Sequence, residues 1–170
     1  MGYEVSRALK APLDVFVARK VGAPNRPELG ISAVAQDGTL VPNESIIKEM
    51  GISEEHIERI AAEETKQAER RLKLFRGGRP EPKLRERTAI LLDDGIATGV
   101  RTRAAIETLR RRDPGHLVLS VPVGAAHTSE SLSKEVDGLI CLEAPSDLMA
   151  ISLWYRHFDQ TSDEEVIELL

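Results

Sequence analysis

Short apolar runs alternate with amphipathic stretches along this chain. Runs of apolar and β-branched residues predict strands at 13–18, 89–92, 116–123 and 136–142. Apolar residues at helical spacing predict helices at about 3–9, 43–50, 53–75, 102–112 and 129–134. Because strands and helices alternate, the pattern predicts an α/β fold with a mainly parallel sheet and flanking helices.

Local turn and capping signals refine this picture. Gln36-Asp37-Gly38 lies between two apolar runs and predicts a β-hairpin. The stretch 22–27 is rich in proline and glycine and predicts a loop. Residues 62–73 are dominated by charged and amide side chains, which indicates the solvated face of a helix. Thr161 or Ser162, followed three residues later by a glutamate, predicts a capped terminal helix.

The segment 88–111 carries the clearest chemical signal. The apolar run 89–92 is typical of a strand buried on both faces of a parallel sheet, and Asp93 and Asp94 follow at its carboxyl end. Ligands bind at that end of strands in open α/β sheets. Gly95 and Gly99 allow a tight turn and close approach to a ligand, and Thr98 adds a hydroxyl.

A helix predicted just after this turn makes an anion site, because its first N–H groups have no partner inside the helix. The sequence has neither the lysine of a Walker loop nor the spacing of a dinucleotide fingerprint. Two acids precede the turn. The pattern therefore favours one ligand that offers hydroxyls to the acids and a phosphate to the turn, such as a ribose 5-phosphate.

Leu-Leu-Asp-Asp-Gly-Ile-Ala-Thr-Gly, residues 91–99, resembles the phosphoribosyl-diphosphate (PRPP) motif of type I phosphoribosyltransferases. The resemblance implies that Asp93 and Asp94 hold the ribose hydroxyls. It also implies that the following loop binds the 5-phosphate, through Gly95, Ile96, Ala97, Thr98, Gly99 and Thr102. Magnesium is expected to enter with PRPP, near Asp93 and Asp94, with no ligand set supplied by the protein alone.

Two basic pairs are candidates for the leaving pyrophosphate. Arg19 and Lys20 follow the predicted strand 13–18, so they would reach the same sheet edge as the acids; a solvated strand end is the alternative. Arg76 and Arg79 flank Gly77-Gly78, and arginine forks match phosphate oxygens. A loop in this part of the chain closes over PRPP in the resembled family. A plain exposed turn is the alternative.

The family pattern begins earlier than this chain does. Type I phosphoribosyltransferases normally start with a helix and then a central strand that carries a pyrophosphate loop, whereas residues 2–5 look like the helix after that loop. The expectation is an N-terminally incomplete domain, lacking a strand between 13–18 and 89–92. Three explanations stay open: an upstream start codon, a sheet that closes differently, or a homodimer in which a second copy supplies the strand.

Length and composition set the broader limits. A chain of 170 residues suits one domain over 1–170, with a helical insertion and flexible loop at about 43–82 and a hood at about 143–170. The tail holds three of the six aromatic residues: Trp154, Tyr155 and Phe158. They could pack the terminal helix against the body, or stack on a base as in the hood of the resembled family.

Other function classes fit poorly. No apolar run approaches the 18 residues of a membrane span, and a net charge of −5 argues against nucleic-acid binding. A lone Cys141 in an apolar run indicates a buried thiol in a reducing cytoplasm, and the four histidines lack ligand spacing.

The sequence therefore predicts a phosphoribosyltransferase that joins the phosphoribosyl group of PRPP to an unidentified nitrogen nucleophile, for example a nucleobase. The alternative is a non-catalytic module that binds PRPP or a nucleotide.

Overall fold

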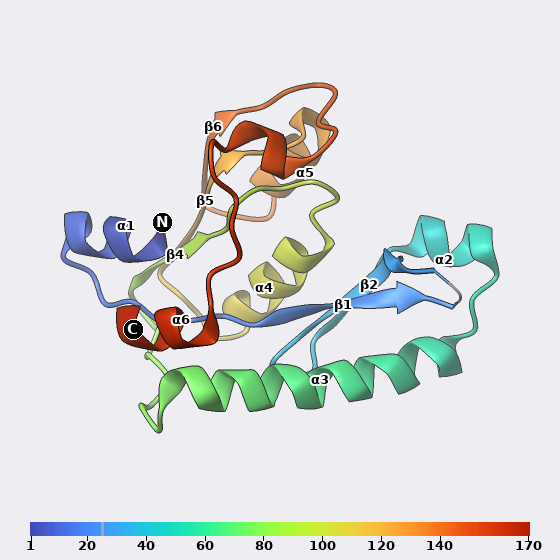
Figure 1. Ribbon diagram of the computed structural model, residues 1–170, viewed down its shortest axis with the longest axis horizontal. Coiled ribbons are helices and arrows are strands. Elements are labelled where there is room, and N and C mark those ends of the chain that lie inside the picture. Colours follow the sequence, from blue (N-terminus) through green and yellow to red (C-terminus); the bar gives the residue numbers. More distant parts are fainter. Residues whose placement is uncertain (25) are drawn as a thin grey trace. The chain divides into compact units, whose positions relative to one another are not determined.

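The computed structural model describes residues 1–24 and 26–170, with the side chains of residues 27 and 28 left out. The chain divides into two compact units (Figure 1). The first unit contains residues 1–15, 74–99 and 112–170, and the second contains residues 16–73 and 100–111. The expectation of one domain over residues 1–170 stays a prediction.

The first unit is built on a parallel sheet in the order β4-β5-β6. The strands are β4 (Thr88–Leu92), β5 (His116–Val123) and β6 (Gly138–Glu143), which confirms the three predicted strands and the α/β class. Alternate residues of β5, from Leu117 to Val123, are almost fully buried on one face. Among the described strands β5 is the one neighbour of β4, so β4 lies at the sheet edge.

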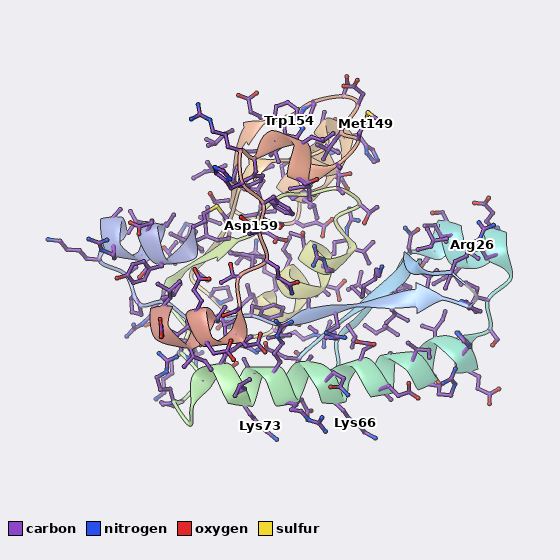
Figure 2. All side chains as sticks on the ribbon, viewed as in Figure 1. Arg26, Lys66, Lys73, Met149, Trp154 and Asp159 are labelled. Atoms are coloured by element: carbon purple, nitrogen blue, oxygen red, sulfur yellow. The ribbon has the colours of Figure 1, made fainter. Side chains whose placement is uncertain are left out.

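Four helical segments belong to this unit: α1 (Gly2–Leu9), α5 (Ala126–Ser133), the 3-10 helix η1 (Ile151–Trp154) and α6 (Asp163–Leu169). The Ser162 hydroxyl accepts a hydrogen bond from the N–H of Glu165 at 3.2 Å, which confirms the predicted cap of the terminal helix. Figure 2 shows Met149 and Trp154 at the surface of this part of the chain, and both are exposed. Cys141 is half-buried, not buried as predicted, because β6 is the other edge strand.

The second unit contains an antiparallel sheet in the order β1-β2-β3. Its strands are β1 (Ala18–Ala23), β2 (Arg26–Ala35) and β3 (Leu40–Pro42). The hairpin predicted around Asp37-Gly38 is confirmed, since β2 and β3 pair on either side of it. The Asp37 carboxylate closes this turn by accepting the N–H of Thr39 at 3.1 Å.

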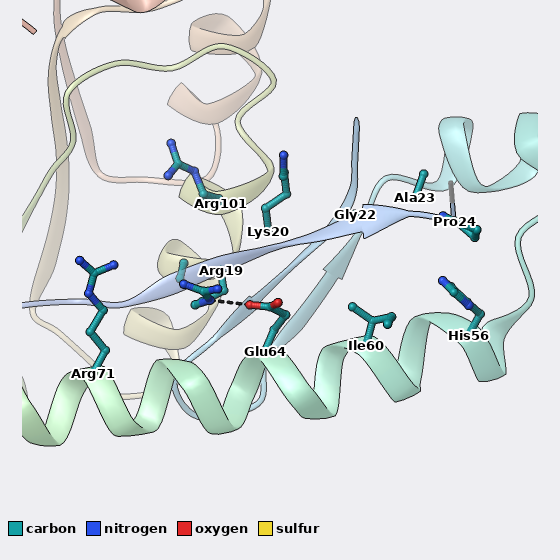
Figure 3. Close-up of a pocket in the computed structure, with 11 residues that line it drawn as sticks. Arg19, Lys20, Gly22, Ala23, Pro24, His56, Ile60, Glu64, Arg71 and Arg101 are labelled. Carbon is teal, nitrogen blue, oxygen red and sulfur yellow. Dashed lines mark hydrogen bonds and ion pairs between the residues drawn. The ribbon is translucent and has the colours of Figure 1, made fainter. Parts of the chain in front are cut away.

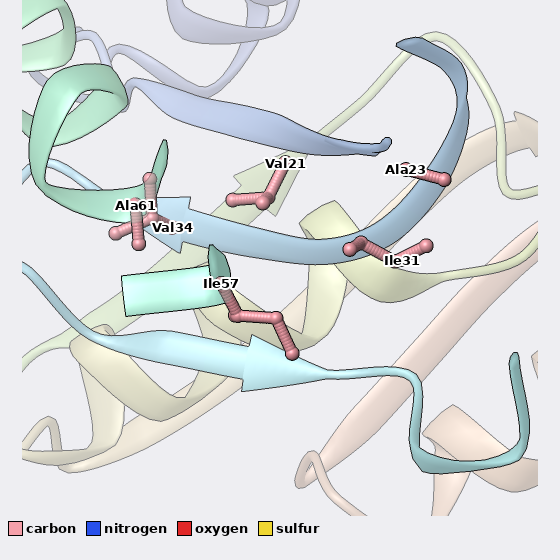
Figure 4. Close-up of a cluster of buried hydrophobic side chains, with 6 residues drawn as sticks. All are labelled: Val21, Ala23, Ile31, Val34, Ile57 and Ala61. Atoms are coloured by element: carbon pink, nitrogen blue, oxygen red, sulfur yellow. The ribbon is translucent and has the colours of Figure 1, made fainter. Parts of the chain in front are cut away.

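Helices α2 (Glu44–Met50), α3 (Glu54–Arg76) and α4 (Val100–Arg110) complete the chain, and residues 74–76 of α3 belong to the first unit. The Asn43 side chain caps α2 as predicted. Ile57 and Ala61 of α3 pack with four residues of the sheet: Val21, Ala23, Ile31 and Val34 (Figure 4). Lys66 and Lys73 are exposed and project outward from α3, as expected for a solvated face (Figure 2).

The predicted strand at 13–18 is wrong. Residues 11–17 are outside any strand, and β1 begins at Ala18. The apolar run is satisfied in another way: Phe16 packs on a buried cluster of the second unit, and the N–H of Val17 donates to the Gln36 side chain at 2.9 Å. The predicted loop 22–27 is also shorter, because β1 runs to Ala23 and β2 starts at Arg26; Asn25 lies outside the described residues.

None of the described helices combines the length and apolar character needed to cross a membrane.

Candidate functional site

The two predicted acids lie on a loop, residues 93–99, that follows β4 and precedes α4; we call it the acid loop. Its backbone is fixed beside the end of β5. The N–H of Asp93 donates to the Ser120 carbonyl at 3.3 Å, and the N–H of Ile96 donates to the Val123 carbonyl at 3.0 Å. The Ile96 carbonyl in turn accepts the N–H of Ala125 at 2.8 Å. The loop is therefore an extension of the sheet rather than a loose turn.

Neighbouring side chains explain both glycines of the acid loop. A Cβ atom on Gly95 would lie 2.8 Å from Ile151 Cγ2 and 3.0 Å from the Val123 carbonyl oxygen. A Cβ atom on Gly99 would lie 2.7 Å from Thr128 Cγ2, and its φ of 73° is left-handed. Packing within the first unit thus requires glycine at both positions. The sequence had suggested a tight turn and close approach to a ligand as the reasons, and not packing against α5 and residue 151.

Asp94 has an unsatisfied carboxylate oxygen. Its Oδ1 atom is buried and accepts no hydrogen bond from the described residues. The adjacent Asp93 Oδ1 accepts the N–H of Asp94 at 3.0 Å, so this carboxylate is turned toward the loop backbone. A buried carboxylate oxygen without a donor costs roughly 1–3 kcal/mol or more. A ligand hydroxyl that donates to Oδ1 would remove this cost.

The sequence reasoning missed Tyr155 as a neighbour of the acids. Its hydroxyl donates a hydrogen bond to the backbone carbonyl of Asp94 at 2.5 Å. Burial raises the pKa of Tyr155, and the negative charges of Asp94 and Asp93 raise it further. The phenol therefore stays protonated and remains a donor across the neutral range. The concentration of aromatic residues in the tail was the one signal in the sequence, and it did not indicate which partner they contact.

The predicted phosphate-binding residues differ in accessibility. Ile96 is 1% exposed and its N–H is already used in the sheet extension. Ala97 and Thr98 are exposed at the tip of the acid loop, and the Ala97 carbonyl accepts the hydroxyl of Thr128 at 2.9 Å. Thr102 lies on the first turn of α4, in the second unit, where it is buried. Ala97 and Thr98 are thus the exposed residues among the predicted phosphate-binding residues of the acid loop.

Arg19 and Lys20 are the second and third residues of the antiparallel strand β1, which corrects the prediction that they stand at the carboxyl end of a parallel strand. They line a cavity of about 940 Å³ in the second unit, beside β1 (Figure 3). Arg71 of α3 and Arg101 of α4 line the same cavity, whose walls also carry His56 and Glu64. We call this the basic cavity. Four cationic side chains against one carboxylate favour an anionic occupant.

Arg19 is already ordered by a neighbour in the basic cavity. Its Nε donates to the Glu64 carboxylate at 2.5 Å, and both side chains are partly exposed. Figure 3 shows Glu64 reaching from α3 toward Arg19 on β1, whereas Lys20 and Arg101 lie on the opposite side of β1.

Arg76 and Arg79, the predicted lid arginines, make contacts within the first unit. The Arg76 guanidinium forms a fork with Asp14, with distances of 3.1 and 2.6 Å, and also contacts Glu81 at 3.1 Å. Burial lowers the pKa of Arg76, but the two carboxylates outweigh burial and raise it. Arg79 donates to the carbonyl of Leu170 and, at 3.1 Å, to that of Arg76. Neither arginine lines the basic cavity.

Within the described residues, no group of three or more histidine, cysteine, aspartate or glutamate side chains could hold a metal ion.

Known proteins resemble this chain along its length. No protein-family model matches it. Two Mycobacterium tuberculosis proteins, of strains CDC 1551 / Oshkosh and ATCC 25618 / H37Rv, are each 35% identical over 170 residues. They are named "Putative phosphoribosyl transferase MT0597" and "Putative phosphoribosyl transferase Rv0571c". The alignment covers 100% of this chain and 38% of each relative, so the chain spans well under half of their length.

A solved structure gives the corresponding comparison in three dimensions. The crystal structure of TT1426 from Thermus thermophilus matches with a TM-score of 0.77 at 32% sequence identity. The match covers 98% of this chain and 79% of the TT1426 chain.

Proposed function

We propose that this chain, which is 35% identical over its full length to two proteins named as putative phosphoribosyl transferases, transfers the 5-phosphoribosyl group of PRPP to a nitrogen nucleophile and releases pyrophosphate. The observation that carries this proposal is the buried Oδ1 of Asp94, which accepts no hydrogen bond from the described residues. In the proposed complex, a ribose hydroxyl donates a hydrogen bond to this oxygen. This acceptor lies in a loop whose sequence resembles the PRPP motif.

In this proposal Asp93 and Asp94 hold the two ribose hydroxyls. The hydroxyl of Thr98 and the backbone from Ala97 to Gly99 bind the 5-phosphate, because Ala97 and Thr98 are exposed. Magnesium would arrive with PRPP near Asp93 and Asp94, and it would neutralise charge on the leaving pyrophosphate. The protein residues position the sugar; they do not have to form a covalent bond with it.

Within the second unit, the basic cavity lined by Arg19, Lys20, Arg71 and Arg101 is the candidate site for an anionic group such as pyrophosphate. Arg76 and Arg79 are left out of this assignment because neither lines the basic cavity. In the reaction, the bond from ribose C1 to the pyrophosphate oxygen breaks and its electron pair leaves with pyrophosphate. The nitrogen lone pair forms the new bond to C1, and the nitrogen then loses its extra proton. Cations that meet the leaving oxygens lower the barrier electrostatically.

The test compares PRPP with inorganic phosphate in wild type and in Asp94→Asn. PRPP with magnesium is expected to raise the melting temperature of wild type, since ligand at a hundredfold excess over Kd stabilises the native state by about 2.7 kcal/mol. Asp94→Asn should lose most of the PRPP shift and keep the phosphate shift, because the phosphate contacts come from Thr98 and the backbone. Asp113→Asn is the matched control, because Asp113 is exposed and its ion pair with Arg85, at 3.5 Å, is exposed as well.

Pyrophosphate release with purine, pyrimidine and amine acceptors then separates an enzyme from a binding module. Turnover with one acceptor class identifies the nucleophile. PRPP protection without turnover would favour the non-catalytic module, and no protection of well-folded wild type would exclude the PRPP assignment.

A further inference from the structure

The C-terminal segment 151–155 contacts two consecutive residues of the acid loop, and both contacts are made inside the first unit. Tyr155 donates its hydroxyl to the Asp94 carbonyl at 2.5 Å. Ile151 lies so close to Gly95 that no Cβ atom would fit between them. The two partners are about 60 residues apart in sequence, so the fold brings this segment to the acids.

We propose that Tyr155 is a positioning residue: its hydroxyl fixes the Asp94 backbone and thereby keeps the Asp94 carboxylate in place for a ribose hydroxyl. The inference rests on the proposed function for the identity of the ligand. It concerns one hydrogen bond and not the aromatic ring, which packs separately on Phe158 with centroids 5.1 Å apart.

The physical reason is the state of the Asp94 side chain. The free energy of the protein falls if the loop shifts and brings this buried carboxylate oxygen to water or to another donor. The hydrogen bond from Tyr155 opposes that shift, because it holds the carbonyl of the same residue. Ile151 blocks movement at the next residue by filling the space beside Gly95. Together they keep the acceptor ready before the ligand arrives, which lowers the cost of binding.

The donor is suited to this role. Tyr155 is half-buried, and its hydroxyl meets a backbone carbonyl, which can only accept. At this contact the Tyr155 hydroxyl is therefore the donor and the Asp94 carbonyl the acceptor. A backbone acceptor also means that the contact persists whatever side chain occupies position 94, so the effect of Tyr155 can be measured independently of the Asp94 carboxylate.

The experiment compares Tyr155→Phe with Phe158→Leu, using the full chain. Tyr155→Phe deletes only the hydroxyl, whereas Phe158→Leu keeps the hydroxyl and deletes the ring contact. The measurements are the Kd for PRPP with magnesium, the Kd for inorganic phosphate, the KM and kcat for PRPP, and amide hydrogen exchange of residues 93–99 without ligand.

For Tyr155→Phe we expect about tenfold weaker PRPP binding, a KM raised by the same factor, a smaller fall in kcat and unchanged phosphate binding. Hydrogen exchange in the acid loop should become faster while the rest of the sheet keeps its protection. Phe158→Leu should leave the PRPP affinity within about twofold of wild type.

Three results would overturn the inference. One is unchanged exchange of residues 93–99 in Tyr155→Phe. A second is equal loss of PRPP and phosphate binding, which would indicate general loosening of the structure. The third is an equal effect of Phe158→Leu, which would assign the role to ring packing. If wild type does not bind PRPP, the proposed function fails, and the exchange measurement still decides whether Tyr155 holds the acid loop.

Discussion

At the scale of single residues, the surroundings of each carboxylate decide what it can do. Asp94 keeps a buried oxygen without a hydrogen-bond donor among the described residues. Asp14 receives the fork of the Arg76 guanidinium. Asp37 accepts hydrogen bonds from Thr39 and from the Thr108 hydroxyl of α4, and so joins the hairpin turn to a helix of the second unit. Of these three carboxylates, Asp94 is the one with a buried oxygen that accepts no hydrogen bond from the described residues.

Asp37 provides a test of stability against pH. Burial raises the pKa of Asp37, but hydrogen bonds from Thr39 and Thr108 outweigh burial, so the pKa is lowered below the ordinary value of 3.8. A lowered folded-state pKa means that the ionised group stabilises the fold above pH 3.8 and that this contribution is lost as pH falls through the folded-state pKa. Because the residue is partly solvated, the contribution should not exceed about 1 kcal/mol.

Urea unfolding should therefore show that Asp37→Asn is less stable than wild type at pH 6. The difference in unfolding free energy between the two proteins should be smaller at pH 3. Asp113→Asn, which removes an exposed ion pair, should have the same unfolding free energy as wild type at both pH values. A constant difference for Asp37→Asn would mean that the charge of the carboxylate does not matter.

At the scale of elements, the acid loop is held by its packing against α5. Gly99 has a left-handed φ, and Thr128 and Leu132 of α5 occupy the space where its Cβ would lie. Gly78 has a similar φ of 85° but no heavy atom within 4 Å of a Cβ at that position. Comparing alanine substitutions at Gly78 and Gly99 therefore distinguishes the cost of backbone strain from the cost of steric overlap.

Gly78→Ala should cost only the strain of a left-handed alanine, about 1–2 kcal/mol of unfolding free energy. Gly99→Ala should cost that strain and about 1–3 kcal/mol more, because α5 or the loop has to move. Urea unfolding measures both, and PRPP binding should be weakened only in Gly99→Ala. Equal costs would show that α5 adapts to the added methyl group.

At the scale of the whole molecule, the chain crosses between its two units four times, after residues 15, 73, 99 and 111. Each unit has buried residues of its own, represented by Leu119 in the first and Ile31 in the second. Trp154, the single tryptophan, lies in the first unit and reports on that unit. Far-UV circular dichroism has a large contribution from α3, most of which lies in the second unit.

We predict that Ile31→Ala shifts the circular-dichroism midpoint in urea more than the tryptophan midpoint, and that Leu119→Ala does the reverse. Each substitution removes a fully buried side chain and should cost about 2–5 kcal/mol in its own unit. If the circular-dichroism and tryptophan midpoints shift equally in both variants, the two units unfold together.

The sequence by itself determined what depends on near neighbours along the chain. The strand 89–92 followed by two acids, the hairpin at Asp37-Gly38 and the cap at Ser162 were all predictable, because turn geometry, capping and periodicity act over a few residues. The two acids and the glycine-spaced turn after them were identified in the same way, and their ligand roles stay predictions.

Only the tertiary structure decided how apolar and charged residues are shared between distant segments. The run 13–18 has the composition of a strand, yet the strand starts at Ala18 because its pairing with β2 sets the register. Arg76 looked available for a phosphate, but Asp14, 62 residues away, binds it. Tyr155 reaches Asp94 across 61 residues. Such contacts depend on which surfaces the fold brings together, and no local pattern of residues encodes that choice.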